Sequence, residues 1–339
     1  MQRKMGEGEL LDAQGRLVER GWATHEARRY RRTAIKAGPL RIKEWDYYCV
    51  LSDAYGVALT VADNDYVGFL GVTWLDFRAG AAASADALIP FPMGKMRLPE
   101  SIETGDVVQS TPAINIAYRH APGGRTLTFN AKEFDGGRGL SGEVFLAQPA
   151  MDRMTIATPF PDAPRAFYYN QKINCLRASG AVTIGGERFE FAPETAMGVL
   201  DWGRGVWTYD NTWYWGSASG VVEGRAFGFN IGYGFGDTSA ASENMVFVDG
   251  RAHKLSQVTF HLPHGPLDKA PWRFSSDDGR FEMSFAPIVD RASRMNLGMI
   301  ESNQHQVFGR FSGEVVLDDG SKLVVNDLIG FAERVHNRW

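Results

Sequence analysis

The residues best suited to chemistry lie together in one segment, residues 201–215, which holds four of the nine tryptophans of the chain. If residues 213–215 form a strand, two of its indoles share one face of that strand. A mostly apolar pocket with a few polar groups suits a small hydrophobic ligand, so we expect the tryptophans and the cation of this segment to contact one. Its aromatic and ionisable residues are Asp201, Trp202, Arg204, Trp207, Tyr209, Asp210, Trp213, Tyr214 and Trp215.

Asp201 is the candidate acid of this segment, and Tyr209 and Asp210 are further catalytic candidates. Burial among indoles raises the pKa of a carboxyl group, and aromatic faces stabilise a carbocation-like transition state. Such a site would protonate a double bond, or an ether or hydroxyl oxygen. Two structural interpretations compete with this one. Asp201 could pair with Arg204 to fasten a turn, and the tryptophans could serve only as core.

Three polar residues outside this segment are further candidates. Asn230 lies in a Gly-rich apolar run and Glu243 follows a Gly-rich turn, so both would place a polar group at the mouth of a barrel, in contact with substrate. His305 offers a general base or a hydrogen-bond donor. The alternatives are strand-end positions for Asn230 and Glu243 and an ordinary surface position for His305.

The sequence predicts neither a metal site nor a bound cofactor. Asp327, Glu333 and His336 do not have the spacing of a zinc site. No GxSxG, phosphate-loop or HExxH motif occurs, and the glycines of residues 228–236 do not form a dinucleotide fingerprint. Cys49 and Cys175 lack CxxC spacing, which favours the reduced thiols of a cytoplasmic protein.

Strands must position these residues, because the composition and the turn signals both favour β-structure. The chain has 21 Phe, 11 Tyr and 38 Gly, and aromatic residues fit pleated surfaces while glycine supplies positive φ. Polar and apolar residues alternate at 126–129 and 281–285, as in half-buried strands. Helical periodicity is nearly absent apart from a short helix expected at residues 25–34. The dipeptides that predict hairpin turns are Gly123-Gly124, Gly185-Gly186, Asp249-Gly250, Asp278-Gly279 and Asp319-Gly320.

An internal similarity predicts two related halves. Residues 140–146 (LSGEVFL) return as residues 311–317 (FSGEVVL), and each copy follows a strand that begins with Gly-Arg. This pattern is typical of an ancient duplication. The Pro-rich residues 149–164 would link the halves. We therefore expect an N-terminal arm (residues 1–40), a first barrel-like domain (residues 41–164) and a second one (residues 165–339).

Charge and hydropathy limit the expected partners. The formal net charge of -4 gives no electrostatic reason to expect nucleic acid. No run of about 18 apolar residues could span a bilayer, although peripheral contact with a membrane is compatible with the sequence. The first residues lack the apolar run of a secretory signal. We expect a cytoplasmic protein that binds a small hydrophobic molecule.

Three blocks of sequence carry a resemblance to a known family: residues 43–48 (KEWDYY), residues 201–215, and residues 306–333, which begin QVFGR and end GFAE. Over nearly its whole length the chain resembles the bacterial domain of unknown function 2804. More distantly, it is similar to the carotenoid hydratase and AttH-like group, whose members include hydratases, cyclases and lipid carriers. The resemblance implies two consecutive lipocalin-like antiparallel β-barrels or sandwiches.

In the hydratase branch of that group, the ligand chamber holds Asp, His, Tyr and Trp groups that suit acid-assisted addition of water to an isoprenoid double bond. The tryptophan-rich segment has no histidine, so His305 or His336 would have to supply that group. The residues that match in type are Asp201, Trp202, Trp207 and Tyr209.

Three functions are compatible with these patterns. The first is a cofactor-independent enzyme that hydrates, cyclises or isomerises a hydrophobic, isoprenoid or lipid-like substrate. The second is a non-catalytic lipid carrier in which the Ala-rich residues 79–89, expected as a short helix or a loop, act as a flap over the barrel mouth. The third is a carbohydrate-active protein in which Asp201 and Asp210 are paired carboxylates.

Overall fold

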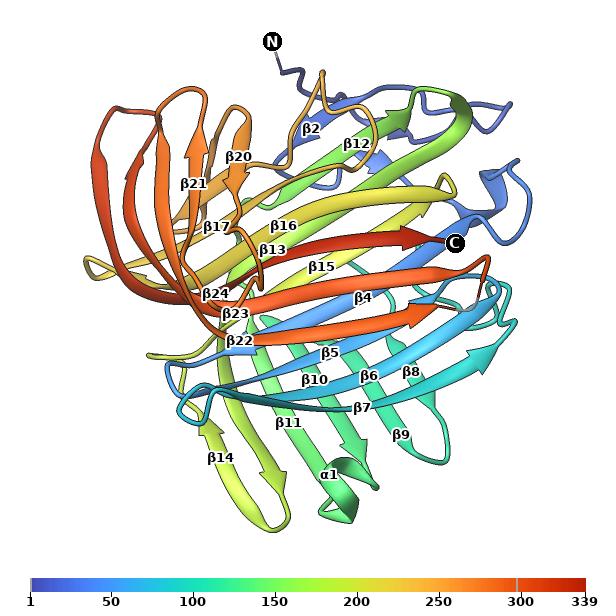
Figure 1. Cartoon of the computed structure of the whole chain (residues 1–339). Coiled ribbons are helices and arrows are strands. Elements are labelled where there is room, and N and C mark those ends of the chain that lie inside the picture. The colour runs from blue at the N-terminus through green and yellow to red at the C-terminus, as the bar shows by residue number, and fades with distance from the viewer. Residues whose placement is uncertain (1, 297) are drawn as a thin grey trace.

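Strands make up most of the computed structural model, which describes residues 2–296 and 298–339. They form two large, curled antiparallel sheets (Figure 1). In the described residues, the helices are the three-residue 3-10 helix η1 (Arg32–Ala34) and the one-turn α1 (Phe134–Gly137). None of them has the length and apolarity needed to cross a membrane. The mainly β fold class predicted from the sequence is confirmed.

The first sheet is built mainly from residues 42–206. Its strands are β4 (Ile42–Leu51), β5 (Tyr55–Asp63), β6 (Val67–Asp76), β7 (Ala81–Pro90), β8 (Val107–Ser110), β9 (Ile114–Ala121), β10 (Gly124–Ala131), β11 (Leu140–Ala147), β12 (Met154–Phe160), β13 (Ala163–Ile184), β14 (Glu187–Phe191) and β15 (Met197–Val206). The main path runs β7-β6-β5-β4-β15-β13-β11-β10-β9-β8, and β12 and β14 pair with β13. This order places β15, which carries Asp201, in the middle of the sheet.

The second sheet follows after residues 207–209. Its strands are β16 (Asp210–Val222), β17 (Arg225–Tyr233), β18 (Met245–Val248), β19 (Arg251–Lys254), β20 (Val258–His261), β21 (Trp272–Ser276), β22 (Phe281–Asn296), β23 (Glu301–Val316) and β24 (Lys322–Arg338). The order is β19-β18-β17-β16-β24-β23-β22-β21-β20. The domain boundary expected at residues 164/165 falls at the beginning of β13, so it does not mark the passage between the sheets.

All five predicted hairpin turns are confirmed. Each dipeptide joins two strands that are paired with each other, and each includes at least one residue with positive φ. The pairs of strands are β9 and β10, β13 and β14, β18 and β19, β21 and β22, and β23 and β24.

The short helix or loop expected at residues 79–89 is wrong, because residues 81–90 form β7 at the edge of the first sheet. From Ala81 to Pro90 it pairs residue by residue with β6, which gives the β6 backbone a second hydrogen-bonded neighbour. The short alanine side chains do not prevent this, since strand formation depends on context more than on intrinsic preference.

The N-terminal arm lies against the first sheet. Its strands are β1 (Gly8–Glu9), β2 (Gly21–Ala23) and β3 (Arg28–Arg29); β1 pairs with β3, and β2 pairs with β12. Leu10 and Tyr30 of the arm are buried. The helix expected at residues 25–34 is wrong except for η1, because the chain there is extended and pairs with β1.

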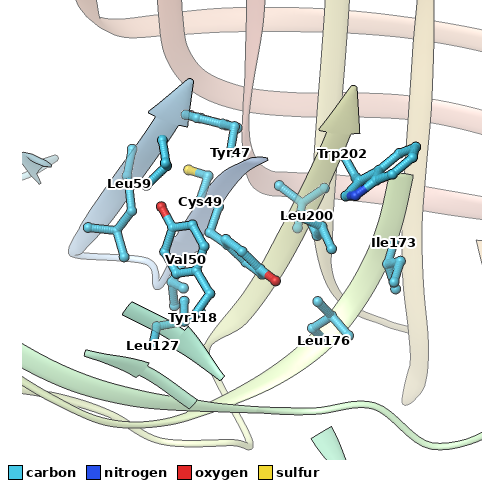
Figure 2. Packing of buried hydrophobic residues seen from close by; sticks show 14 of the residues in the cluster. Tyr47, Cys49, Val50, Leu59, Tyr118, Leu127, Ile173, Leu176, Leu200 and Trp202 are labelled. Carbon is cyan, nitrogen blue, oxygen red and sulfur yellow. The ribbon is translucent and has the colours of Figure 1, made fainter. Parts of the chain in front are cut away.

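Two hydrophobic cores stabilise the fold. The larger fills the first sheet, where Leu200 and Trp202 of β15 lie beside Ile173 and Leu176 of β13 (Figure 2). It also includes Trp215, Phe308 and Phe331 of the second sheet, so it continues into the junction between the two sheets. The smaller core lies within the second sheet.

Candidate functional site

Polar candidate residues meet where the two sheets face each other. On the first sheet, Tyr47 of β4, Asp201 of β15 and Lys172 of β13 are cross-strand partners. Such partners project from the same face of a sheet. This face points at the second sheet, because Lys172 Nζ lies 3.5 Å from Glu243 Oε2 and 4.0 Å from the ring centre of Trp215.

The second sheet contributes a matching row of side chains. Trp215 of β16, Glu333 of β24 and Gln306 of β23 are cross-strand partners. The hydroxyl group of Tyr47 donates a hydrogen bond to Gln306 Oε1 at 3.2 Å, and its ring packs edge-on against Trp215 at 5.9 Å. The two rows therefore contact each other both through Tyr47 and through Lys172.

Lys172 is a buried cation between two carboxyl groups. Its Nζ lies 3.0 Å from Asp201 Oδ1, in addition to its contact with Glu243. Burial raises the pKa of Glu243, an effect that Lys172 and a hydrogen bond from Asn230 oppose. Asn230 in turn accepts a hydrogen bond from Trp215 Nε1 at 2.6 Å. Asp201, Trp215, Asn230 and Glu243, all candidates from the sequence, thus form one cluster around Lys172.

Asp201 is bound by two donors on β13. Asn170 Nδ2 donates to Asp201 Oδ1 at 2.6 Å, beside the contact with Lys172. Arg204, the expected partner of Asp201 in the turn interpretation, forms its ion pair with Asp46 at 2.8 Å. Successive strand residues point to opposite faces, so Asp201 and Arg204 lie on different sides of β15.

Glu333 is the partly exposed residue among the three acidic residues of the cluster, whereas Asp201 and Glu243 are buried. Burial raises the pKa of Glu333 to about 7, and a hydrogen bond from Trp213 opposes the increase. Trp213 Nε1 donates to Glu333 Oε1 at 3.0 Å. A carboxyl group with a pKa near 7 exchanges protons at neutral pH, as general acid–base catalysis requires.

Trp202 and Arg204 lie inside the first barrel, away from this cluster. Trp202 is 1% exposed and packs edge-on against Tyr30 and Tyr169. The guanidinium carbon of Arg204 lies 4.1 Å from the centre of the Trp202 ring. The cavity beside Trp202 has a volume of about 10 Å³, which is room for about one water molecule. Trp202 and Arg204 therefore contribute to the packing of the first barrel.

Trp207 connects the cluster to a surface hollow. Its ring lies 5.3 Å from that of Trp213, the hydrogen-bond donor to Glu333. Together with Tyr209 it lines an open hollow of about 510 Å³. Trp207 is 2% exposed, whereas Tyr209 is 42% exposed. The two aromatic residues therefore contribute differently: Trp207 is mostly packed against other rings, and Tyr209 stands at the rim.

The remaining catalytic candidates do not join the cluster. Asp210 is exposed and lies 2.9 Å from His336 Nε2. His305 Nδ1 lies 2.7 Å from Asp290 Oδ2. Tyr209 donates its hydroxyl hydrogen to the main-chain oxygen of Met299. In the described part of the chain, no group of three or more His, Cys, Asp and Glu side chains is arranged to hold a metal ion.

Lys172, Tyr47 and Gln306 were not among the candidate residues predicted from the sequence, and Glu333 was considered there only for a metal site that its spacing excludes. One signal for Lys172 was present, because polar residues 170–172 interrupt a run that begins with aromatic residues 167–169. Glu333 likewise follows the apolar residues 330–332 directly. Polar side chains inside apolar strands are costly to bury unless they are paired, so such interruptions indicate paired or functional groups.

Comparisons with known proteins concern the fold and the family. The structure is similar to that of an AttH-type protein from Nitrosomonas europaea, with a TM-score of 0.54, 16% identity and coverage of 87% of this chain and 92% of that chain. It is also similar to kievitone hydratase from Nectria haematococca, with a TM-score of 0.51, 10% identity and coverage of 98% of each chain. These similarities confirm the expected two-barrel, lipocalin-like fold.

The sequence comparisons are consistent with this architecture. No curated protein matches the sequence. A family model described as "Domain of unknown function (DUF2804)" matches residues 2–339. The match covers nearly the whole chain, which therefore belongs to the DUF2804 family.

Proposed function

We propose that the chain is an enzyme that hydrates or isomerises a small hydrophobic molecule by acid–base catalysis, without a cofactor, at the junction of the two sheets. The observation that carries this proposal is Glu333, a partly exposed residue whose carboxyl group has its pKa raised by burial to about 7 and belongs to the cluster of Lys172, Asp201 and Glu243. The fold shared with kievitone hydratase, a protein named for a hydration reaction, supports the same class of chemistry.

In the proposed hydration, protonated Glu333 donates its proton to one carbon of a double bond, and the π bond breaks. A water molecule attacks the other carbon, forms the C–O bond, and returns a proton to the Glu333 carboxylate. In an isomerisation, the carbon next to the cationic carbon instead loses a proton to the Glu333 carboxylate, and the electrons of the broken C–H bond form the new double bond. Both reactions leave Glu333 in its original state, so neither consumes a co-reactant other than water.

The side chains around Glu333 suit a positively charged transition state. Trp213 holds one carboxyl oxygen by its indole N–H, and Gln306 Nε2 donates to the other at 3.3 Å. The faces of indole rings attract a developing cation. Trp213 and Trp215 lie on one face of β16, as predicted, because Tyr214 packs instead against Tyr233 on the other face. We assign Trp213 to orienting Glu333 and to contacting an apolar substrate.

Asp201 has a different role in this proposal from the one expected at first. A general acid must hold a proton, whereas Asp201 forms an ion pair with Lys172 and accepts a second hydrogen bond from Asn170. We therefore assign Asp201 to fixing the position of Lys172. Asp210 cannot act with Asp201 as a pair of sugar-cleaving carboxylates, because it projects from the face of β16 opposite to Trp213.

The experiment uses Glu333→Gln and isotopically labelled water. Purified protein is incubated with an apolar metabolite extract in water enriched in oxygen-18, or in deuterium oxide, and the products are identified by mass spectrometry. The wild-type protein should form a product that carries one labelled water molecule or one deuteron. The variant should form it at least about 100-fold more slowly, the usual contribution of a general acid.

Glu282→Gln, an exchange of an exposed glutamate on β22, is the matched control and should retain the wild-type rate. A labelled product that Glu333→Gln forms at the wild-type rate would contradict the role of Glu333. An apolar molecule that co-purifies with the wild-type protein and is recovered without label would instead favour the carrier.

A further inference from the structure

The open hollow beside Trp207 has a strongly positive rim. It is lined by Arg16 of the N-terminal arm, Arg41 just before β4, and Arg165 near the beginning of β13. These arginines come from three separate parts of the sequence and converge on one surface feature of about 510 Å³. No aspartate or glutamate is among the residues that line it.

Within the described residues, none of the three guanidinium groups forms an ion pair with an aspartate or a glutamate. Arg165 Nη1 donates to the main-chain oxygen of Lys36 at 3.2 Å. Arg41 Nη1 lies 3.5 Å from the main-chain oxygen of Trp339. Arg16 is exposed. Because the chain as a whole carries a net charge of -4, the concentration of positive charge here does not follow from the overall composition.

The walls of the hollow are apolar and aromatic. Tyr209 contributes an exposed ring, and Ala163 and Pro164 contribute aliphatic surface. Val206 and Trp207 also line the hollow, with exposed fractions of 3% and 2%. The Arg41 guanidinium carbon lies 5.9 Å from the centre of the Tyr209 ring, within the range of a cation–π contact. That contact orders one of the arginines at the rim.

We propose that this hollow is a binding site for a small molecule that joins a flat hydrophobic ring system to an acidic head group, either a carboxylate or a phosphate. Guanidinium groups recognise the oxygens of both head groups through paired N–H donors. The ring system would lie on the apolar wall beside Trp207. Glu333 does not line the hollow, so this binding site stands independently of the proposed function.

The test compares two fluorescent probes that share the same rings. 8-Anilinonaphthalene-1-sulfonate carries an acidic group, whereas N-phenyl-1-naphthylamine is its uncharged counterpart. The full-length protein should bind the sulfonate at one site, at least about tenfold more tightly than the neutral probe. Arg165→Gln and Arg41→Gln should each weaken binding of the sulfonate by about five- to twentyfold and leave binding of the neutral probe unchanged.

Arg78→Gln is the matched control, because Arg78 is exposed and lies outside the hollow. Its affinity for the sulfonate should equal that of the wild type, and circular dichroism should establish that every variant is folded. Equal affinity of the wild type for both probes, or unchanged sulfonate binding by the folded Arg165→Gln and Arg41→Gln variants, would overturn the proposal.

Displacement of the sulfonate distinguishes the two head groups. The competitors are 1-naphthoate and 1-naphthyl phosphate, which share one ring system. Displacement by either one supports the site, and the tighter competitor identifies the preferred head group. If neither displaces the sulfonate, the hollow does not recognise these acidic head groups and the proposal is wrong.

Discussion

Glu333 and Glu243 are glutamates of the same cluster, and burial raises the pKa of both. Glu243 is enclosed and lies beside Lys172 and Asn230, which stabilise its charge. Glu333 is a partly exposed residue, and its carboxyl group receives its hydrogen bonds from the neutral groups of Trp213 and Gln306. This difference in surroundings is why the exchangeable proton is assigned to Glu333 and a supporting charge to Glu243.

The raised pKa of Glu333 predicts a pH-dependent stability. The ordinary pKa of 4.5 applies in the unfolded chain and a value of about 7 in the folded protein, so folding favours the protonated form. The resulting stabilisation is complete below pH 4.5 and is lost as the pH rises through 7. The Glu333→Gln variant lacks this pH-dependent stabilisation. Relative to wild type, its free energy of unfolding should therefore increase by about 2–3 kcal/mol between pH 4.5 and pH 8.

Urea unfolding at the two pH values measures this difference. Glu282→Gln serves again as the control, and its free energy of unfolding relative to wild type should be the same at both. If the difference between Glu333→Gln and wild type does not change with pH, then Glu333 does not titrate near neutrality and its role as proton donor fails as well.

At this scale the sequence predicted part of the cluster. Asp201, Trp213 and Trp215 were found because they lie in one segment, but Tyr209 and Asp210, chosen for the same reason, do not join the cluster. Asn230 and Glu243 were chosen as polar groups for a barrel mouth and do join it, whereas His305, chosen as a possible base, does not. Lys172 and Glu333 come from strands remote in sequence from Asp201, and only the pairing of β13 with β15 and the packing of the two sheets bring these side chains together.

At the scale of the elements, glycines of β15 make room for the rings at the junction. A Cβ atom at Gly203 would lie 2.1 Å from atoms of the Trp45 indole, its cross-strand neighbour on β4. At Gly205 it would lie 3.0 Å from Trp207 Nε1 and 2.6 Å from the main-chain oxygen of Phe167. These glycines allow large rings to lie flat on the face that carries Asp201.

Gly203→Ala should therefore destabilise the protein by about 1–3 kcal/mol or more, because the added methyl group overlaps the Trp45 ring in a packed region. Urea unfolding monitored by circular dichroism measures the effect. Gly38→Ala is the control, since no atom lies within 4 Å of the position of its Cβ, and it should change stability by less than about 0.5 kcal/mol. The double variant Gly203→Ala with Trp45→Leu should lose less free energy of unfolding than the sum of the losses in the two single variants. An additive loss would exclude the steric explanation.

The elements themselves were predicted well wherever local signals decide them. The Gly-Gly and Asp-Gly dipeptides predicted five hairpin turns, and the alternation of polar and apolar residues predicted β10 and β22. The errors lie where tertiary pairing decides: β7 is rich in alanine and is a strand because β6 offers it a partner. The β-bulge of β13 was equally invisible in the sequence. Cys175 has a φ of 60° there, and the pairing with β15 shifts between Ile173 and Leu176.

At the scale of the whole molecule, the two sheets repeat one plan. In the first, β4 to β7 form one meander and β8 to β11 another; in the second, β16 to β19 and β20 to β23 do the same. The similar segments lie at corresponding places in this plan: residues 140–146 fall in β11, and residues 311–316 of the second copy form the end of β23. Between the meanders the second sheet has only β24, whereas the first has β13 and β15. This addition to the first sheet supplies Lys172 and Asp201, and it explains why a boundary at residue 165 does not separate the sheets.

The junction should make the two sheets unfold as one unit. The larger core includes residues of both sheets, and Asn174 Nδ2 of β13 donates to Ser217 Oγ of β16 at 2.8 Å.

Lys172→Met leaves two buried carboxyl groups without their cation and should lower the free energy of unfolding by about 3–5 kcal/mol. In urea, labelling of the buried thiol of Cys49 reports opening of the first sheet, and hydrogen exchange of β22 reports opening of the second. Because the cation is shared between Asp201 of the first sheet and Glu243, which lies in the loop that joins β17 and β18 of the second sheet, both signals should shift together in the variant. Separate midpoints, with only the thiol signal displaced, would mean that the sheets are independent and that the charges at their junction do not couple them.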